Sequence, residues 1–482
     1  MKKNNTEKIV FPEPNDVLKA KPSFGKYLKY LLFFGPGAIL VSMTIGQGQL
    51  IIGPTIGAWA GFSLLWLITL NIASYNAAYV GSRFTMLSGI SIMDVFAIKS
   101  KKGWINWVFI FIIMVFIPLF VATIINTMGQ TINWVAGRGH PLAWGLLFCL
   151  LAAFLVLLGR YKALEFSQAI FVAFLGAGAV ISVVMIKPDF FEMLPNFFMI
   201  GNVPTYPAWV DNVEGFTKTA IPLSMLGFLG TMTISIIPLV GYLGWVKVKR
   251  WGIFKDKKDP DAFSDEMFLR FKKSEGIEYL PDDEKEIKKS RLLLKPLLID
   301  LSIAFVLVTI ISTAYMVAGK ELLGAEQIIP TDLNLVKEQA RIFTSIGGWL
   351  EPMYKISVFF ALFGTVYAGF EAVTRMLFES SKHISKKINN IDYWKFMIYV
   401  LIYILATGVP VAVLIFYEVS IMLILSITLL FIGVVGVIVY GFASVYMTQR
   451  ILPKRYRLSS VPLLISILTI VLFMIPFLFL II

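Results

Sequence analysis

The stretch "SMTIGQGQL", residues 42–50, interrupts a long apolar run with two glycines and two glutamines. A membrane helix satisfies its backbone hydrogen bonds internally, and a break frees N–H and C=O groups that cost several kcal/mol each if they face lipid. Such groups must instead line a cavity enclosed by protein, where they can coordinate a solute and where half-helix ends add partial charges. The stretch therefore predicts a broken membrane helix beside a binding site.

The composition of the whole chain is that of an integral membrane protein. Of its 482 residues, 57% are hydrophobic and 15% charged, and apolar stretches of about 20 residues recur, each long enough to cross a hydrocarbon core of about 30 Å. Soluble and secreted classes are thereby excluded. The single cysteine, Cys149, excludes a disulfide framework and a thiol metal cluster. His140 and His383 fall in connecting segments, so no span offers a histidine for metal or proton chemistry.

The net charge of +13 does not indicate nucleic-acid binding, because the cations lie at span ends and no nucleic-acid-binding motif is present. No Ser-His-Asp set, phosphate-cradling glycine loop or ATP-binding motif appears. We therefore expect neither an enzyme nor an ATP-driven pump, and no cofactor. The expected partners are the lipid bilayer and a small inorganic ion or small organic solute, with no nucleic acid and no obligate protein partner.

Hydropathy predicts eleven membrane spans. They cover 28–60, 63–83, 104–131, 142–159, 163–187, 218–246, 294–318, 349–379, 392–417, 419–448 and 459–482. Lys and Arg gather in the connections after the second, fourth, eighth and tenth spans, whereas the short connections on the other side carry almost none. Because Lys and Arg mark cytoplasmic loops, we expect a multi-pass protein of the cell membrane with its N-terminus in the cytoplasm and its C-terminus outside.

A second interrupted stretch, "TMTISIIPL" at 231–239, aligns with the first without a gap. Both read Ser/Thr-Met-Thr-Ile, then four residues, then Leu, and the breakers are Gly46 and Gly48 in one and Pro238 in the other. The two stretches head groups of five spans that face opposite ways. A lone Gly or Pro would indicate a packing kink, but corresponding breaks in two inverted halves are the signature of a secondary transporter.

These features divide the chain into segments. They are a cytoplasmic tail (1–27), a first five-helix repeat (28–187), an external loop (188–217), a second five-helix repeat (218–448) and a cytoplasmic turn with an eleventh helix (449–482). Residues 247–293 form a charged cytoplasmic loop in which Ser264 is the expected N-cap of a helix from Asp265 to Glu275. We interpret this loop as a solvated linker whose helix rests on the bilayer; a regulatory partner site is the alternative.

In and around the first interrupted stretch, the chain resembles the Nramp divalent-metal transporters. That family opens with Gly-Pro, follows at a set interval with Asp-Pro-Gly-Asn, and continues to a glycine-rich stretch that ends in Leu-Leu-Trp. The matching residues here, at the same spacing, are Gly35-Pro36-Gly37, Gly46-Gln47-Gly48-Gln49, Gly57, Gly61 and Leu64-Leu65-Trp66. The resemblance implies an all-α membrane protein of the LeuT/APC-type fold, with five-plus-five inverted helices, broken first and sixth helices and an eleventh C-terminal helix.

The chain departs from the family at the metal site. The family's ligands are an aspartate and an asparagine of the first span and a methionine of the sixth, and the matching positions here are Gly46, Gln49 and Ile237. The family's histidine, tied to proton movement, is replaced by Leu239. The third span contains no acid, and the ninth contains no Lys or Arg past its start. The usual metal ligands and the usual proton-relay network therefore have no clear counterpart.

The predicted substrate site is polar but uncharged. Its candidate residues are Thr44, Gly46, Gln47, Gly48, Gln49, Thr233, Ile234, Ser235 and Ile237. If the first break is extended, Gln47 and Gln49 point the same way. Neutral amides and hydroxyls compensate a dehydrated transition ion poorly, so three ligands fit this chemistry. They are a monovalent cation, magnesium that retains several waters, and a small organic solute whose carboxylate meets a half-helix N-terminus.

Four ionisable residues within spans are candidates for gating or coupling: Glu165, Asp300, Glu371 and Arg375. All four are expected toward the cytoplasmic ends, and Glu371 and Arg375, spaced i, i+4, can pair on one helix face. Ordinary pairing near the headgroups is the alternative interpretation. We favour it for Asp300, and for Glu371 we give the two interpretations equal weight. The polar stripe Asn71, Ser74 and Tyr75 is expected to hydrogen-bond between helices.

Together these features predict an Nramp-like secondary transporter that moves a cation by alternating access. By family resemblance the cargo is a divalent metal ion, magnesium-like or weakly selective because the Asp and Met ligands are replaced. Two alternatives stay open. One is a carrier of a small organic solute such as an amino acid on the same fold, and the other is a transport-inactive sensor that signals through residues 247–293.

Overall fold

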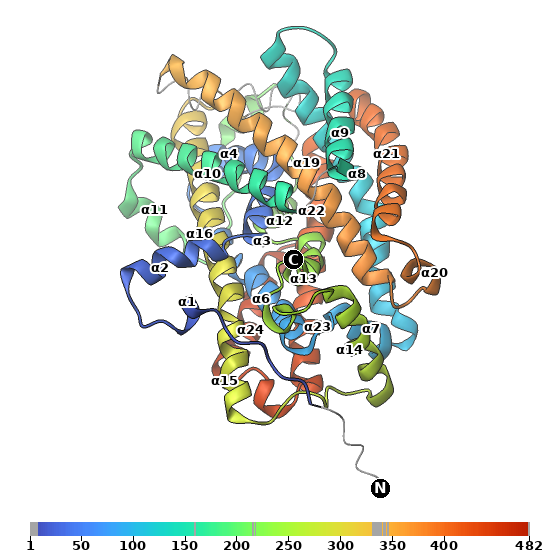
Figure 1. The fold of residues 1–482 in the computed structure, drawn as a ribbon. Coiled ribbons are helices and arrows are strands. Elements are labelled where there is room, and N and C mark those ends of the chain that lie inside the picture. The colour runs from blue at the N-terminus through green and yellow to red at the C-terminus, as the bar shows by residue number, and fades with distance from the viewer. Residues whose placement is uncertain are drawn as a thin grey trace.

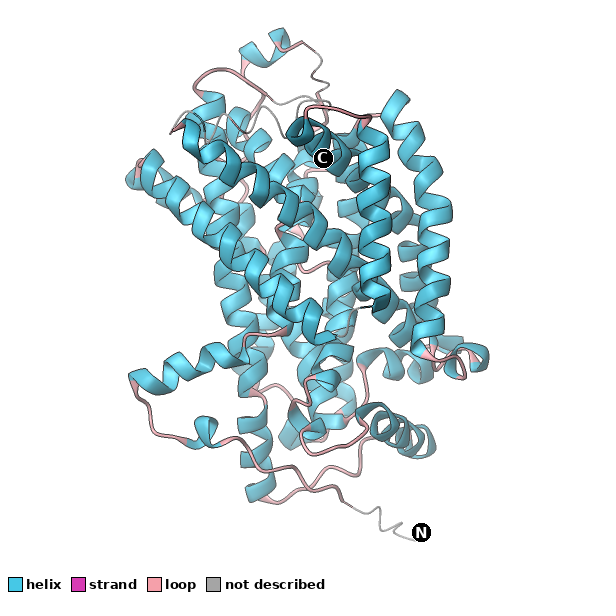
Figure 2. Cartoon of the chain, turned by 45° about the horizontal axis from the view of Figure 1, so that its top comes forward, coloured by secondary structure: helices cyan, strands magenta, loops and turns pink. Residues whose placement is uncertain are grey.

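The computed structural model describes residues 8–158, 161–214, 216, 218–329, 340, 344 and 347–480, and this part of the chain is helical without any strand (Figure 2). Nine of its helices are long and apolar enough to cross a membrane. They coincide with the third to eleventh predicted spans. The first two predicted spans are built from shorter helices that do not pass this test one by one, whereas the sixth, Ile221–Phe254, passes it although it is interrupted.

The first group of helices comprises α3 (Pro36–Thr44), α4 (Gln47–Ala60), α5 (Trp66–Leu70), α6 (Ile72–Ser88), α8 (Trp104–Ala136), α9 (Pro141–Leu158) and α10 (Tyr161–Ile186). The second comprises α12 (Ile221–Met232), α13 (Ile236–Val248), α16 (Lys295–Ala318), α19 (Glu351–Ser381), α21 (Tyr393–Glu418), α22 (Ile421–Leu429) and α23 (Gly436–Ile451). A final membrane helix, α24 (Ser460–Phe473), is followed by the short α25 (Ile475–Leu478). Two broken helices, α3–α4 and α12–α13, thus stand at equivalent places in the two groups.

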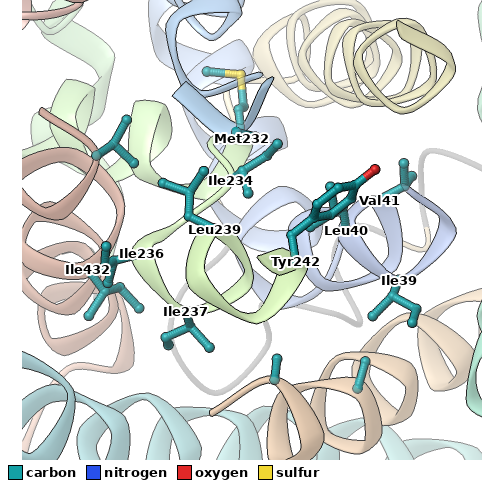
Figure 3. Packing of buried hydrophobic residues seen from close by; sticks show 14 of the residues in the cluster. Ile39, Leu40, Val41, Met232, Ile234, Ile236, Ile237, Leu239, Tyr242 and Ile432 are labelled. Carbon is teal, nitrogen blue, oxygen red and sulfur yellow. The ribbon is translucent and has the colours of Figure 1, made fainter. Parts of the chain in front are cut away.

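The broken helices form the centre of the bundle. Both α3 and α13 are almost entirely buried, and α4 packs against α12 and α16 while α3 packs against α10, α16 and α19. Figure 3 shows Tyr242 of α13 beside Leu40 and Val41 of α3, in the main apolar core. At the periphery, α9 and α10 expose large apolar side chains such as Phe154 and Phe166, as expected of lipid-facing helices.

The chain bends sharply before the first broken helix. Residues Phe24–Phe33, which include α2 (Phe24–Tyr30), meet Pro36–Thr44 at 68°. The side chains of Phe24 and Leu32 are exposed. The first predicted span, which starts at residue 28, is therefore bent, and the helix that continues into the core begins at Pro36.

Residues 247–293 lie at one end of the bundle, in the lower part of Figure 1 with α7 (Ile92–Lys99). We call this end the loop side. The loop contains α14 (Pro260–Ser274) and α15 (Glu284–Leu293). The N-terminal segment packs along it, with the amide of Ile9 donating to the carbonyl of Tyr279 at 2.9 Å and that of Phe11 to Glu286 at 2.7 Å.

The helix predicted within this loop starts earlier than expected. Asp259, not Ser264, is its N-cap, since Asp259 Oδ1 accepts from the amides of Asp261 and Ala262, and the following Pro260 suits a first helical position. Ser264 is buried within α14. The apolar face, which includes Phe268 and Phe271, packs into the protein core rather than on a bilayer.

Candidate functional site

The first break is short and does not extend the chain. α3 ends at Thr44, Ile45 and Gly46 form a turn, and α4 begins at Gln47. Gln47 and Gln49 therefore both belong to the start of α4, and the break is not the extended segment in which the two side chains would point the same way. The side chain of Gln47 lies outside the described residues.

The second break is an extended segment of Thr233, Ile234 and Ser235 between α12 and α13. Thr233 has ψ of 148° and Ser235 has ψ of 167°, so the chain leaves the helix here. Pro238 lies in the first turn of α13, where its missing N–H removes no intrahelical hydrogen bond. The sequence located this break correctly.

Polar side chains of α6 and of the residue before it, Asn71, satisfy the backbone that the second break frees. Asn71 Nδ2 donates to the carbonyl of Met232 at 2.8 Å, and the amide of Ile234 donates to Ser74 Oγ at 3.1 Å. Asn71 and Ser74 thus make the hydrogen bonds predicted for the polar stripe of the second span. The prediction is wrong for Tyr75, whose buried hydroxyl has no hydrogen-bond partner among the described residues. The backbone at the break is thus partly satisfied by protein, as the cost of unpaired groups in a membrane requires.

The two breaks meet through Gln49. Its Nε2 donates to Thr231 Oγ1 at 2.8 Å, across from α4 to α12. Gly48 lies on the same contact, because a Cβ there would stand 2.4 Å from Thr231 Cγ2. The amide oxygen of Gln49 is buried without a hydrogen-bond partner among the described residues. An unsatisfied acceptor at the meeting point of two broken helices is the feature of this site that most suggests a ligand.

Gly46 is packed against α19. A Cβ at Gly46 would lie 1.8 Å from Thr365 Oγ1, which itself donates to the carbonyl of Ser42 at 3.3 Å. No side chain fits at Gly46 in this conformation, so this position cannot carry a carboxylate while Thr365 is present. The glycine is explained by close approach of a neighbouring helix.

The other predicted site residues are tightly enclosed. Thr44, Thr233, Ile234 and Ile237 are buried, and Ser235 is half-buried. The hydroxyls of Thr44 and Thr233 donate to the carbonyls of Leu40 and Gly230, at 2.7 and 3.1 Å. In Figure 3, Ile237 and Leu239 point to different sides of α13. The structure brings the two predicted halves of the site together in a closed arrangement.

Sequence reasoning missed Gln168 of α10. Its Oε1 accepts from Ser42 Oγ on α3, and its Nε2 is buried without a partner among the described residues. Gly364 of α19 lies on the same contact, since a Cβ there would be 3.0 Å from Gln168 Oε1. Only the spatial meeting of α3, α10 and α19 reveals this residue, and no local pattern distinguishes it.

Asp300 caps the N-terminus of α3. Its two carboxylate oxygens accept from the amides of Gly35 and Gly37, each at 2.8 Å, and Tyr242 Oη donates to Oδ2 at 2.5 Å. A Cβ at Gly37 would stand 2.7 Å from Asp300 Oδ1, so the glycine permits the approach. A carboxylate here also complements the positive end of the helix dipole. The side chain is paired, as favoured from the sequence, but with a helix end and not with headgroups.

Carboxylates contact the loop-side half of the second broken helix from several directions. Besides Asp300 at Tyr242, Glu371 Oε2 accepts from Trp245 Nε1 at 2.7 Å. Farther along, Lys247 pairs with Glu379 at 3.0 Å and Lys249 with Glu165 at 2.7 Å. The acids come from α10, α16 and α19. The predicted gating residues Glu165, Asp300 and Glu371 therefore all act on one element, α13 and the residue after it.

Glu371 and Arg375 form the predicted i, i+4 pair at 2.9 Å. Tyr393 of α21 adds a third helix, because its hydroxyl donates to Glu371 Oε1 at 3.0 Å and its ring lies 4.1 Å from the Arg375 guanidinium. Beside them a cavity of about 340 Å³ is lined by side chains of both charge signs. They include Asp261 and Asp265 of α14, and Lys382 at the end of α19. This arrangement can hold or release α13 at the loop side.

A second polar cluster, outside the membrane-spanning segments, was also missed from sequence. His383 follows α19, its Nδ1 lies 2.5 Å from Asp94 Oδ1, and its Nε2 lies 3.4 Å from Asp265 Oδ1. Its ring stacks on Phe268, with centroids 3.6 Å apart. Asp94 also closes a capping box with Ser91 at the start of α7. His383 thus joins α7 and α14 to the end of α19.

These contacts predict a pH-dependent stability. Burial lowers the pKa of His383, but the Asp94 and Asp265 carboxylates outweigh it, and the pKa lies above its ordinary value of 6.5. The proton bound in the folded state therefore adds stability that is fully present below pH 6.5 and is lost as the pH rises through the raised pKa. We expect the melting temperature to fall as the pH rises above 6.5, and we expect His383→Gln to flatten this dependence of melting temperature on pH. An unchanged slope in the variant would contradict the assignment of the effect to His383.

The described residues contain no group of three or more His, Cys, Asp or Glu side chains arranged to hold a metal ion. The described residues of the breaks offer backbone carbonyls, hydroxyls and the side-chain amide of Gln49 instead, and the amide of Gln168 lies beside α3. Such a donor set suits weakly hydrated monovalent ions, hydrated magnesium or neutral polar groups better than a bare transition ion.

Comparison with solved structures identifies the fold. A variant of the manganese transporter of Eremococcus coleocola is 12% identical with a TM-score of 0.66, over 98% of this chain and 89% of that one. The chain has an Nramp-like fold. MhsT in complex with L-phenylalanine is also similar, with a TM-score of 0.54 and 17% identity over 92% of this chain and 97% of that one. No family model and no curated protein matches the sequence.

The predicted LeuT/APC-type fold with broken first and sixth helices is confirmed. Mhp1, a nucleobase-cation-symport-1 family transporter with bromovinylhydantoin bound, has a TM-score of 0.50 and 12% identity, over 92% of this chain and 89% of that one. Two of these similar proteins, the manganese transporter and Mhp1, are transporters. Their low identity leaves the substrate to be argued from this chain's own residues.

Proposed function

We propose that the chain is a secondary transporter that binds a cation between α3–α4 and α12–α13 and moves it by alternating access. The observation that carries the proposal is the contact of two broken, buried helices at Gln49 and Thr231, with an unsatisfied amide oxygen beside it. Half-helix ends and freed carbonyls at membrane depth suit solute coordination. The N-terminus and the loop side would face the cytoplasm, since Lys and Arg gather in the connections there.

The substrate that best fits these donors is a divalent ion of the magnesium type, or a weakly selected cation. Resemblance to the Nramp family favours a divalent metal, yet Gly46 and Ile237 supply neither carboxylate nor thioether. Magnesium dehydrates reluctantly and is bound through retained waters. Amide oxygens such as that of Gln49 can accept hydrogen bonds from such waters without an anionic ligand.

Uptake into proteoliposomes tests this proposal. We expect flux of magnesium or of several cations, with no preference for manganese or iron, and loss of that flux in Gln49→Ala. Gln449→Ala is the matched control, because Gln449 lies on α23 and donates to the carbonyl of Leu458, away from the breaks. Absence of any cation flux, together with absence of metal binding by calorimetry, would exclude a cation transporter.

A small organic solute is the second candidate. It is supported by the similarity to MhsT, whose structure contains L-phenylalanine, and by two side-chain amide atoms that lack a hydrogen-bond partner among the described residues, Gln49 Oε1 and Gln168 Nε2. An amide acceptor and an amide donor could bind an amine and a carboxylate of one molecule. Flux of a labelled amino acid or amine that Gln49→Ala abolishes, without cation flux, would favour this candidate.

We further propose that Glu371, with Trp245 and Tyr393, closes the loop side of the transport path. The change Glu371→Gln removes the charge that pairs with Arg375 and should favour the open state. If the closed state loses about 1.4 kcal/mol, the open population rises about tenfold. A thiol probe can report this, because the chain's only cysteine, Cys149, is buried. We expect Ser235→Cys to react about tenfold faster with a loop-side reagent when Glu371→Gln is also present.

A control separates gating from general loosening. Glu351→Gln breaks a comparable i, i+4 pair with Lys355, 2.8 Å apart at the other end of the same helix. This change should leave the labelling rate of Ser235→Cys unaltered. Equal acceleration by both substitutions would show that Glu371 only stabilises the bundle.

A further inference from the structure

A basic cavity lies at the loop side, apart from the substrate site. It has a volume of about 680 Å³ and lies between α6, the junction of α15 and α16, and the turn before α24. Its cations come from three separate parts of the chain. They are Arg83, Arg291, Lys295, Lys454, Arg455 and Arg457. No Asp or Glu is among its lining residues.

The cations of this cavity lack direct carboxylate partners in the described part of the chain. Among the described residues, none of its six cations takes part in an ion pair with a carboxylate. The nearby carboxylates are directed elsewhere, with Glu286 paired to Lys289 at 2.9 Å and Asp282 to Lys8 at 3.7 Å. By contrast, the cavity beside Glu371 contains both signs. General enrichment of cations in cytoplasmic connections accounts for their number but not for this exclusion of acids.

Backbone carbonyls hold the arginine heads in place. Arg83 Nη2 donates to the carbonyl of Tyr456 at 2.7 Å, and Arg455 Nη1 donates to that of Asp282 at 2.8 Å. Arg457 Nε donates to the carbonyl of Leu452 at 2.8 Å. The other guanidinium nitrogen of Arg83, Nη1, is buried without a hydrogen-bond partner among the described residues. Positioned guanidinium groups with unused donors are suited to a phosphate group.

The walls of the cavity are apolar on one side. Leu294, Leu298 and Pro462 line it, and the side chain of Leu298 is exposed. Val461 and Leu464 of α24 are exposed next to it. Leu298 and Leu464 belong to helices that qualify as membrane spans. Cations at span ends, with an exposed apolar surface leading away from them, match a phosphate headgroup and the start of its acyl chains.

We propose that this cavity binds the phosphate headgroup of an anionic phospholipid, in the leaflet on the loop side of the membrane. The shared chemistry is a phosphate, and the apolar wall favours a lipid over a free phosphate ion. The site is independent of the transported substrate. Bound lipid would connect α6, α16 and α24, which meet at this cavity.

Native mass spectrometry of the full chain tests the proposal. The protein in detergent is mixed with phosphatidylglycerol, phosphatidylcholine or inorganic phosphate, and is then released from the detergent in the mass spectrometer. The variant carries Arg291→Gln and Lys295→Gln, and the matched control carries Lys272→Gln and Lys273→Gln, two exposed cations in the last turn of α14. Both pairs remove the same charge. Neither Arg291 nor Lys295 has an ion pair with a described residue, so folding should be retained, and a melting curve without lipid checks this.

We expect wild-type protein and control to retain phosphatidylglycerol in preference to phosphatidylcholine. Loss of each cation should weaken retention roughly fivefold, and loss of both about 25-fold. Equal retention of the two lipids, or equal weakening in the control, would overturn the proposal. Stabilisation by inorganic phosphate alone, with no retained phosphatidylglycerol, would overturn the lipid and assign the cavity to a soluble phosphate compound.

Discussion

Substituting Gly46 by alanine is expected to destabilise the protein strongly, although it adds only one methyl group. The new Cβ would stand 1.8 Å from Thr365 Oγ1 and 2.8 Å from Thr365 Cβ. Such overlap forces α3–α4 and α19 apart, and overpacking of a closely packed interior costs about 1–3 kcal/mol and occasionally more. The melting temperature in detergent should fall, and transport should fall with it, because the break is part of the proposed site.

Two further variants make this result specific. Gly369→Ala lies on α19, where no atom stands within 4 Å of the added Cβ, so it should be neutral or stabilising by up to about 1 kcal/mol. Thr365→Gly creates room for the methyl group. We therefore expect Gly46→Ala with Thr365→Gly to be more stable than the sum of the single changes predicts, by an interaction energy of about 0.5–3 kcal/mol. Simple additivity of the two changes would show that the helices do not meet here.

The same contact leaves no room for a carboxylate at the position that matches the Nramp family's aspartate. Placing an aspartate at position 46 would require a shift, because Thr365 occupies the space for any side chain. The glycine at position 46 is what allows α19 to approach the first break this closely. The proposed neutral coordination at this break would consequently depend on the packing of the helices and not only on the residue at position 46.

The breaks could be located from the sequence because helix breakers act locally. Gly46 lies at the first interruption, between α3 and α4, and Pro238 lies in the first turn of α13, just after the extended segment that ends at Ser235. The form of each break could not be predicted, because it depends on tertiary contacts. The first remains a turn within a helical path where α19 packs against it, whereas the second is extended and hydrogen-bonded to α6.

Contacts between residues that lie far apart in the sequence were identified only in part. Asp300 was identified as a buried charge, but its partners at Gly35 and Gly37 are 265 and 263 residues away. Gln168 and the Asp94–His383 contact, which spans 289 residues, were not identified at all. Their roles arise where helices cross, and a sequence pattern records periodicity within a helix but not which helices meet.

The change Asp300→Ala should have the second large effect, about 3–5 kcal/mol of stability with loss of transport. It removes the acceptor of three donors at once, the amides of Gly35 and Gly37 and the hydroxyl of Tyr242, and all three bonds are buried or enclosed within the membrane. An unpaired donor costs about 1–3 kcal/mol there, because neither water nor lipid replaces the lost acceptor.

Tyr242→Phe distinguishes the helix cap from the link between helices. It removes one donor and leaves the carboxylate on the two amides of α3, so the cost should be about 1 kcal/mol. If Asp300 acts through the cap of α3, Asp300→Ala exceeds Tyr242→Phe by several-fold in thermal unfolding, and Asp300→Asn lies between them because an amide keeps only one acceptor oxygen. If both changes cost the same, the bond to α13 is the one that matters. Because α3 and α13 belong to opposite repeats, this comparison measures how much of the closed state depends on one carboxylate that contacts both.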